Sequence, residues 1–367
     1  MTDTTKGSGA EIQPFWVDVS QADLDDLDAR LVATRFTDEI PGSGSDYGVS
    51  VEWVRRMVEY WRDGYDWRTW EGRLNAHPQF TTEIDAQNIH FMHVRSTDEA
   101  ALPLILTHGW PGTVVEYLDV IDDLSRDFHL VIPSLPGFGF SGPTKERGWN
   151  RYRMARAWAE LMRRLGYNRY GAVGNDAGSF VSPEVGRVDP EHVVGVHVTQ
   201  IFSFPSGDPS ELEELSEDER AALQRLQWFW ENLGAFNQLQ SQSPQTLAHA
   251  IADSPAGLLG WMGQLLQGLD DGFVLTNVAI HWLCRTAGSS VRFYYEDAKA
   301  AHPTEPSTVP IGLAAFANDF QSIRRFAERD HKDIAQWHTY DVGGHYAAHQ
   351  APDVLVSDIQ TFFNELG

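Results

Sequence analysis

Asp176 stands at the centre of Gly174-Asn-Asp-Ala-Gly178, between an apolar run over 170–173 and the segment that begins at Ser179. A tight turn with small residues on both sides makes the central side chain project outward, as a nucleophile requires. A carboxylate in that place attacks a saturated carbon and leaves an alkyl ester on the protein. The pattern therefore predicts opening of a strained ether or displacement of a halide, whereas a serine there would predict ester or peptide hydrolysis.

Two further residues can complete a hydrolytic triad with Asp176. A Gly-x-nucleophile-x-Gly turn between a strand and a helix is the nucleophile elbow of the α/β-hydrolase fold, where an acid and then a histidine follow along the chain. His345 ends Val342-Gly-Gly-His, after a strand-like run over 334–340. Asp319 follows the apolar run over 309–316 and is the predicted acid that orients the imidazole. Other carboxylates lie in a charged helix or linker, where exposure to solvent is the simpler interpretation: Glu328, Asp330, Asp333 and Asp341.

An oxyanion hole is predicted from His108-Gly-Trp-Pro-Gly112, which follows a short apolar run over 102–106. We expect the backbone N–H groups of Trp110 and Ala177 to stabilise a tetrahedral intermediate formed on Asp176 itself. In that mechanism His345 deprotonates the water that attacks the ester. The alternative is a proline-glycine turn that packs its tryptophan.

The elements that position these residues divide the chain into four segments. Residues 1–80 have helical, tryptophan-rich patterns, and apolar strands alternate with helices over 81–204. Only helical patterns occur over 205–300, and strands resume over 301–367. We predict an α/β-hydrolase fold, with a mostly parallel sheet flanked by helices, an inserted helical cap, and an N-terminal helical meander packed on the core. The helices expected in the cap cover 211–220, 223–240, 244–253, 257–269 and 272–285.

Composition narrows the classes of partner and compartment. A net charge of −24 over 367 residues argues against binding of nucleic acid or of an anionic membrane surface. The single cysteine excludes an internal disulfide, the start of the chain lacks the pattern of a signal peptide, and no apolar run is long enough for a membrane span. We therefore expect a cytoplasmic enzyme that acts on a small molecule.

Over almost its whole length the chain resembles the microsomal-type epoxide hydrolases of the α/β-hydrolase superfamily. The shared features are the tryptophan-rich start, the Asp-centred elbow, His108-Gly-Trp-Pro-Gly112, Pro136-Gly-Phe-Gly-Phe-Ser141, Arg292-Phe-Tyr-Tyr-Glu296 and Gly343-Gly-His345. The resemblance implies conversion of epoxides to vicinal diols without a cofactor or metal. It assigns nucleophile Asp176, acid Asp319 and base His345, with cap residue Tyr294 rather than Tyr295 as hydrogen-bond donor to the epoxide oxygen. It also implies a soluble bacterial-type member, since the membrane anchor of the mammalian enzymes is missing, and a homodimer.

Two departures from the family pattern bear on the substrate. Ala177 stands where the family usually has tryptophan, which keeps the N–H and enlarges the pocket. Phe236 stands where a second cap tyrosine is usual, and it cannot donate a hydrogen bond. A roomy aromatic pocket, lined by Phe236 and by Trp228 or Trp230, suits a bulky aromatic epoxide. Such a substrate fits natural-product biosynthesis, including that of enediyne antibiotics, and it also fits detoxification.

Two alternatives remain open at this level. A haloalkane dehalogenase also uses an Asp nucleophile, but its halide is typically bound by a tryptophan where this chain has Ala177. A non-catalytic binding protein of the same fold is supported only by the missing hydroxyl at Phe236.

Overall fold

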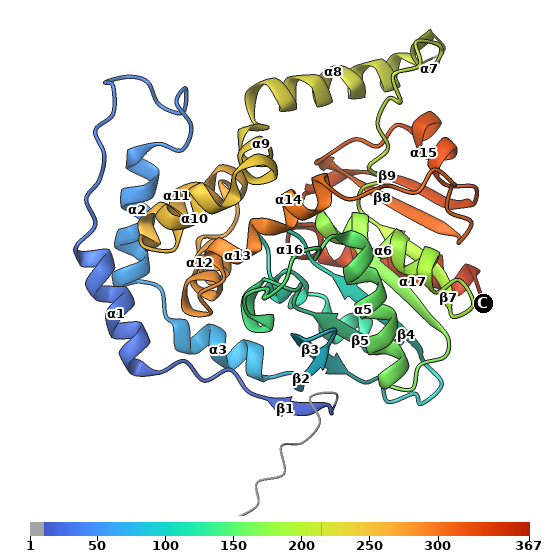
Figure 1. Ribbon diagram of the computed structural model, residues 1–367, viewed down its shortest axis with the longest axis horizontal. Coiled ribbons are helices and arrows are strands. Elements are labelled where there is room, and N and C mark those ends of the chain that lie inside the picture. Colours follow the sequence, from blue (N-terminus) through green and yellow to red (C-terminus); the bar gives the residue numbers. More distant parts are fainter. Residues whose placement is uncertain (1–10, 214) are drawn as a thin grey trace, which may run out of the picture.

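The computed structural model describes residues 11–213 and 215–367, so the prediction about a signal peptide at the start of the chain lies largely outside it (Figure 1). The described residues build one sheet of nine strands in the order β1-β2-β3-β5-β4-β6-β7-β8-β9. The strands are β1 Gln13–Phe15, β2 Gln79–Ile84, β3 Gln87–Val94, β4 Leu102–Thr107, β5 Phe128–Pro133, β6 Tyr170–Gly174, β7 Val193–Val198, β8 Ile311–Asn318 and β9 Ile334–Gly344.

The sheet is parallel from β5 to β9 and antiparallel at the β1–β2–β3–β5 end. All residues of β5 and β6 are buried, as expected for parallel strands that are covered on both faces. The predicted fold class is therefore confirmed. Sequence reasoning missed β1, because three residues with a central proline show no alternation of apolar and polar side chains.

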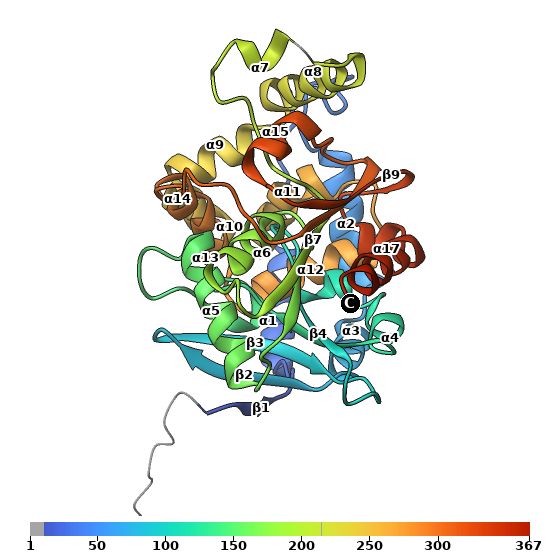
Figure 2. The ribbon, with the colours of Figure 1, turned by 90° about the vertical axis from the view of Figure 1, so that its right-hand side faces the viewer.

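Helices cover both faces of the sheet. In Figure 2 the sheet lies between α17, on one side, and α5 and α6, on the other. Glycines let α17 approach: a Cβ at Gly312 would lie 2.6 Å from Phe362 Cδ2, and one at Gly171 would lie 2.3 Å from Phe363 Cε1. The helices around the sheet are α4 Ile121–Leu124, α5 Arg151–Arg164, α6 Ala177–Val188, α15 Arg324–Asp330, α16 Ala347–Gln350 and α17 Pro352–Glu365.

A helical cap is inserted between β7 and β8 (Figure 1). Its helices are α7 Ser210–Glu213, α8 Glu217–Asn232, α9 Ala235–Gln242, α10 Pro244–Ile251, α11 Pro255–Leu266, α12 Asp271–Leu283, α13 Ala287–Ser290 and α14 Arg292–Ala298.

Two of the helices predicted for the cap were wrong in their bounds. The single helix expected over 223–240 is broken after Asn232, beside Gly234, and glycine is a weak helix former. The helix expected over 211–220 does not form as one unit. Instead Ser216 and Glu219 make a capping box, which starts α8 at Glu217.

The N-terminal helices are α1 Gln21–Val32, α2 Val51–Asp63 and α3 Trp67–Asn75. We expected this segment to pack on the core; in the structure α1 contacts α11, and α2 contacts α11 and α12 of the cap. A Cβ at Gly263 would lie 2.6 Å from Trp53 Cζ3, so the glycine makes room for the indole. The segment therefore helps to fix the cap over the sheet.

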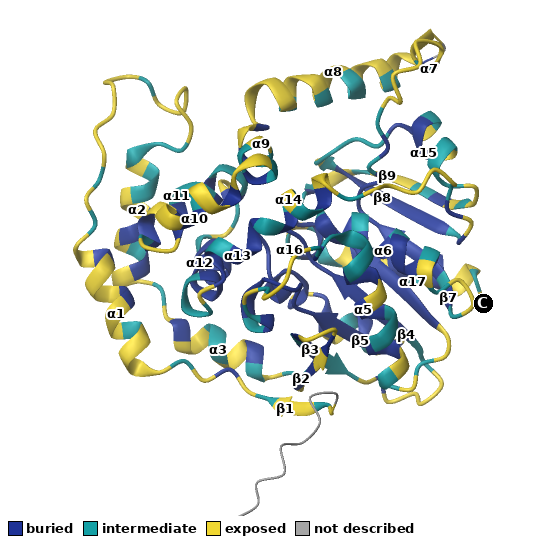
Figure 3. Ribbon diagram, viewed as in Figure 1, coloured by how far each residue is buried: buried dark blue, intermediate teal, exposed yellow. Residues whose placement is uncertain are grey.

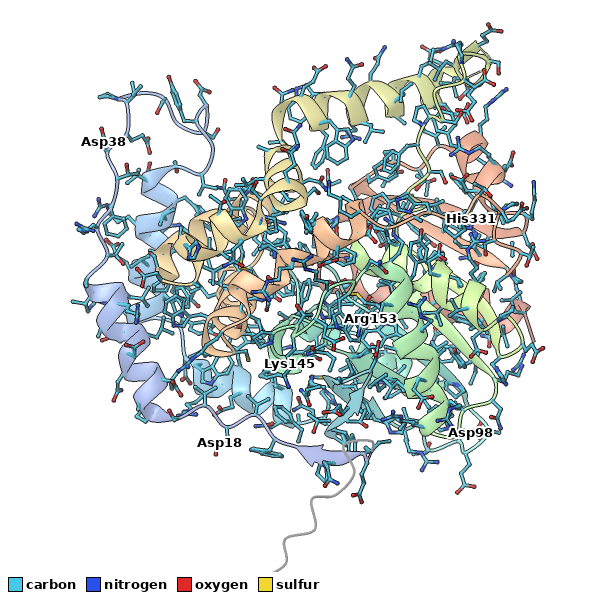
Figure 4. The ribbon with its side chains drawn as sticks, in the orientation of Figure 1. Asp18, Asp38, Asp98, Lys145, Arg153 and His331 are labelled. Atoms are coloured by element: carbon cyan, nitrogen blue, oxygen red, sulfur yellow. The ribbon has the colours of Figure 1, made fainter. Side chains whose placement is uncertain are left out.

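Burial follows this architecture, with the sheet and the inner faces of its helices dark in Figure 3. Acidic side chains such as Asp18, Asp38 and Asp98 are exposed and lie at the rim of the molecule in Figure 4. Within the described ranges, none of the helices has the length and apolar character needed to cross a membrane.

Candidate active site

The nucleophile elbow is a strained turn between β6 and α6. Asp176 has φ 53° and ψ −115°, a left-handed backbone conformation that is rare outside glycine. The flanking glycines are required by close packing. A Cβ at Gly174 would lie 2.1 Å from Gly178 O, and one at Gly178 would lie 1.9 Å from Thr107 O. The turn therefore aims the Asp176 carboxylate out at the carboxyl edge of the sheet, where sites of open α/β sheets form.

The loop after β4 supplies a hydrogen bond to this carboxylate. Trp110 N–H donates to Asp176 Oδ1 at 2.9 Å. Gly109 lies directly against the nucleophile, because a Cβ there would be 2.2 Å from Asp176 Oδ1. Ala177 is the first residue of α6, so its N–H is among those that have no acceptor within the helix. This geometry suits the predicted oxyanion hole, in which Trp110 and Ala177 both donate.

His345 lies between the two carboxylates. Its Nε2 is 3.5 Å from Asp176 Oδ2, and its Nδ1 is 2.8 Å from Asp319 Oδ1. The register of the last two strands brings the histidine and the acid together, since Asn318 of β8 is paired with Gly344 of β9. The three side chains differ in exposure, at 22% for Asp176, 30% for His345 and 6% for Asp319. The carboxylate that orients the histidine is thus screened from water, and the nucleophile and base are accessible.

Electrostatics favour a protonated His345 in the resting site. Burial by itself would lower the pKa of His345. The charge of Asp319 and the hydrogen bonds to Asp176 and Asp319 more than offset that effect, so the pKa of His345 is raised well above its usual value. Since part of this influence comes from Asp176, neutralising Asp176 would bring the pKa of His345 down.

Three aromatic rings from the cap and the Trp110 loop meet above the triad. The Phe236 ring of α9 stacks on Trp110 with centroids 5.8 Å apart, and Tyr294 of α14 lies edge-on to both rings. Burial, followed by the charge of Asp176, raises the pKa of Tyr294 well above its usual value. Its hydroxyl therefore stays neutral and able to donate a hydrogen bond.

Comparisons with known proteins agree with this geometry. The family described as "Epoxide hydrolase N terminus" matches residues 12–117, and the family "alpha/beta hydrolase fold" matches residues 103–252. A protein of Stigmatella aurantiaca named "Putative epoxide hydrolase" is 37% identical, with 97% of this chain and 85% of that protein covered. The chain belongs to the microsomal-type epoxide hydrolases.

More distant relatives of this epoxide hydrolase carry related names. "Epoxide hydrolase 1" of Sus scrofa is 28% identical over 97% of this chain and 89% of its own length. A solved structure of an enantioselective mutant of the Aspergillus niger epoxide hydrolase has a TM-score of 0.87 at 30% identity, covering 97% of this chain and 96% of that one. These findings confirm the predicted enzyme class and leave the two alternatives, a dehalogenase and a binding protein, without support.

Not every predicted pocket residue of the epoxide hydrolase lies at the triad. Trp228 and Trp230 of α8 are 56% and 38% exposed, and among the described ring contacts it is Phe229 that reaches Phe236. The aromatic content of α8 was visible in the sequence, but not which of its faces turns inward. A substrate-binding role for Trp228 or Trp230 thus stays a prediction that this geometry does not support. Tyr295 is 39% exposed, whereas Tyr294 lies against the rings of Trp110 and Phe236.

Sequence reasoning missed Gln200, a fully buried residue that joins the two carboxylate residues of the triad, Asp176 and Asp319. Its Oε1 accepts the Asp176 N–H at 2.9 Å and the Ser179 hydroxyl at 2.8 Å. Its Nε2 donates to Asn175 Oδ1 at 2.8 Å and to Asp319 Oδ2. The only signal in the sequence is its place two residues after β7, and that place does not reveal its partners.

A cavity of about 300 Å³ is lined in part by Gln200. It is lined by both polar and aromatic side chains, among them Ser179, Phe180, Phe202 and His331. His331 is labelled in Figure 4. Gln200 therefore borders this cavity and also accepts the backbone N–H of the nucleophile.

Proposed function

We propose that the enzyme converts a bulky, aromatic epoxide to a vicinal diol through an ester on Asp176. The observation that carries the proposal is the position of His345, with Nε2 3.5 Å from Asp176 Oδ2 and Nδ1 2.8 Å from Asp319 Oδ1. A histidine so held can activate water against an ester on the neighbouring carboxylate.

In the first step Asp176 Oδ2 attacks an epoxide carbon, and the carbon–oxygen bond of the strained ring breaks. The Tyr294 hydroxyl donates to the departing epoxide oxygen, which becomes a hydroxyl. Asp176 Oδ1 keeps its hydrogen bond from Trp110 N–H and becomes the carbonyl oxygen of the ester. The product of this step is a β-hydroxyalkyl ester.

In the second step His345 takes a proton from water, and the water oxygen adds to Asp176 Cγ. Before this step, esterification has removed the charge of Asp176 and so lowered the pKa of His345. The proton that His345 carried in the resting site passes to the Tyr294 oxygen, which restores the Tyr294 hydroxyl and leaves His345 neutral and basic. The N–H groups of Trp110 and Ala177 stabilise the oxyanion at Oδ1. The bond from Cγ to Oδ2 then breaks, and the diol leaves with the proton held by His345. The proton left on the Asp176 acid passes to His345, which restores the resting charges of both groups.

The preference for a bulky aromatic substrate is supported by two features. Ala177 places only a methyl group next to the nucleophile, where the resemblance to the family implies a tryptophan. The rings of Trp110, Phe236 and Tyr294 offer apolar faces to an aryl group, and aromatic pairs add about 1 kcal/mol beyond simple burial. With Phe236 in the cap, Tyr294 is the donor that acts on the epoxide.

A single turnover in H₂¹⁸O tests the two-step mechanism. Because the bond to Cγ breaks in the second step, the label should appear in Asp176 and be absent from the first equivalent of diol. Label in that diol would instead show direct attack of water on the epoxide. Turnover of cis-stilbene oxide, styrene oxide and a small aliphatic epoxide, compared by kcat/KM, tests the size preference. Equal or better use of the aliphatic epoxide would contradict it.

The expected cytoplasmic location and homodimer remain part of the proposal. Sedimentation velocity of the purified enzyme tests the dimer, which a single monomer-sized species at micromolar concentration would exclude. Fractionation of the source cells tests the location.

A further inference from the structure

A carboxyl group is buried beneath the nucleophile and has no role in the mechanism above. Glu116 lies in the short 3-10 turn Val114–Tyr117, which follows the Trp110 loop, and only 1% of it is exposed. Its Oε1 accepts a hydrogen bond from Asn175 Nδ2 at 2.7 Å. Its Oε2 is buried without a hydrogen-bond partner among the described residues. An ionised carboxylate in such a place is strongly disfavoured, because one amide donor does not replace its lost hydration.

The titratable groups that face Glu116 are Asp176, His345, Tyr346 and Tyr117. Burial raises the pKa of Glu116 to about 8, against the hydrogen bond from Asn175, the positive charge of His345 and a smaller effect of the Gly109 backbone. The negative charge of Asp176 acts in the same direction as burial and is included in that value. Glu116 is therefore mostly uncharged at neutral pH and ionises above it.

A chain of buried hydrogen bonds connects Glu116 with the triad. Asn175 precedes the nucleophile, and its Oδ1 accepts the Thr199 hydroxyl at 2.6 Å and Gln200 Nε2 at 2.8 Å. Gln200 in turn accepts a hydrogen bond from the Asp176 N–H and donates one to the Asp319 carboxylate. In both amides the nitrogen faces only acceptors and the oxygen faces only donors. The Asn175 and Gln200 side chains therefore each have one favourable orientation.

The charge state of Glu116 also matters to the oxyanion. Gly112, at the end of the Trp110 loop, packs against Glu116: a Cβ there would be 3.0 Å from Glu116 Oε2 and 3.4 Å from Tyr346 Cε1. The ester hydrolysis step places a negative charge on Asp176 Oδ1, which the same loop holds through Trp110 N–H. A second negative charge beneath it would oppose that step in a site of low dielectric constant.

We propose that Glu116 is a positioning residue, whose uncharged carboxyl group fixes Asn175 under the nucleophile and keeps the floor of the oxyanion hole neutral during ester hydrolysis. This inference rests on the proposed two-step mechanism. It goes beyond that mechanism because it makes the rate of ester hydrolysis depend on Glu116, a group that never touches the substrate.

The test compares Glu116→Gln with Glu116→Met by single-turnover kinetics from pH 6.5 to 9.5. Glutamine copies the neutral carboxyl, with an oxygen for Asn175 and N–H donors in place of Oε2. Methionine has a similar length and leaves Asn175 Nδ2 without its acceptor. Glu52→Gln, at an exposed position of α2, is the matched control for loss of a carboxylate. Ester formation is followed by the mass of the peptide that carries Asp176, and hydrolysis by the decay of that mass.

For the wild type and Glu52→Gln we expect the hydrolysis rate to fall above pH 8, approaching tenfold per pH unit once Glu116 is ionised. For Glu116→Gln we expect a rate within about twofold of wild type at pH 7 and no such alkaline fall. For Glu116→Met we expect at least a tenfold loss at every pH. The proposal is overturned if Glu116→Gln keeps the alkaline fall, if the wild type has none, or if Glu116→Met hydrolyses the ester normally. Absence of any ester in the wild type would instead refute the underlying mechanism.

Discussion

Gly109 offers the sharpest perturbation of the nucleophile without a change to any reacting group. In Gly109→Ala the new Cβ would lie 2.2 Å from Asp176 Oδ1, 2.3 Å from its Cβ and 2.6 Å from its Cγ. Ordinary contacts between such atoms are longer by about 1 Å. The whole aspartate side chain must therefore shift, because it cannot turn away from three simultaneous overlaps.

A shift of about 1 Å separates Asp176 from its hydrogen bond to Trp110 N–H, which is 2.9 Å long in the structure. A misplacement of that size costs about 100-fold in rate, and loss of one oxyanion donor costs about 100- to 1,000-fold. We therefore expect kcat for diol formation to fall by at least about 100-fold, with ester formation and ester hydrolysis both slowed.

The assay is diol formation at saturating styrene oxide, accompanied by single-turnover mass spectrometry and a thermal unfolding curve. Gly72→Ala in α3 is the matched control, because a Cβ at Gly72 meets nothing within 4 Å. It should leave kcat unchanged and slightly stabilise the helix. A Gly109→Ala protein with more than half of the wild-type kcat would refute the assigned packing of loop and nucleophile.

Three further predictions concern the cap and the far face of the sheet. Tyr294→Phe removes the donor to the epoxide oxygen and should lower the rate of ester formation by about 100-fold while leaving hydrolysis of ester already formed unchanged; equal effects on both steps would contradict the assignment. Phe236→Tyr adds a hydroxyl beside Tyr294 and should speed ester formation from styrene oxide, and an unchanged or slower step would show that Phe236 does not face the epoxide. Asp358 is buried, which would raise its pKa, but donors such as His197 and Tyr340 lower the pKa below the usual 3.8. The ionised Asp358 therefore contributes its full stabilisation above pH 3.8 and loses it as the pH falls through the lower pKa of the folded state. The thermal midpoint should drop steeply below about pH 4. Asp358→Asn should flatten this drop and lower the free energy of unfolding near neutral pH by about 3 kcal/mol.

The triad could be predicted from the sequence because each member lies in a local pattern. The elbow has its two glycines, His345 has Gly343 and Gly344 before it, and Asp319 directly follows β8. These patterns record backbone geometry, which short stretches of sequence determine. The resemblance to known epoxide hydrolases then supplied Tyr294, a cap residue whose spacing alone predicts no function.

The supporting network could not be predicted in the same way. Gln200 and Glu116 act through hydrogen bonds to residues 21 to 119 positions away, and a buried polar residue has no sequence pattern that identifies its partner. The exposure of Trp228 and Trp230 likewise depends on which face of α8, Glu217–Asn232, packs against the rest of the cap. The helical spacing of its aromatic residues does not determine that face.

The central claim is that substrate becomes an ester of Asp176 that His345 must hydrolyse. The most direct measurement is the mass of the His345→Gln protein, and of its peptides, after mixing with styrene oxide. Added mass equal to one epoxide should accumulate on the peptide that contains Asp176 and persist, while Asp176→Asn gains none. Full turnover by His345→Gln, or added mass on any other residue, would contradict the account.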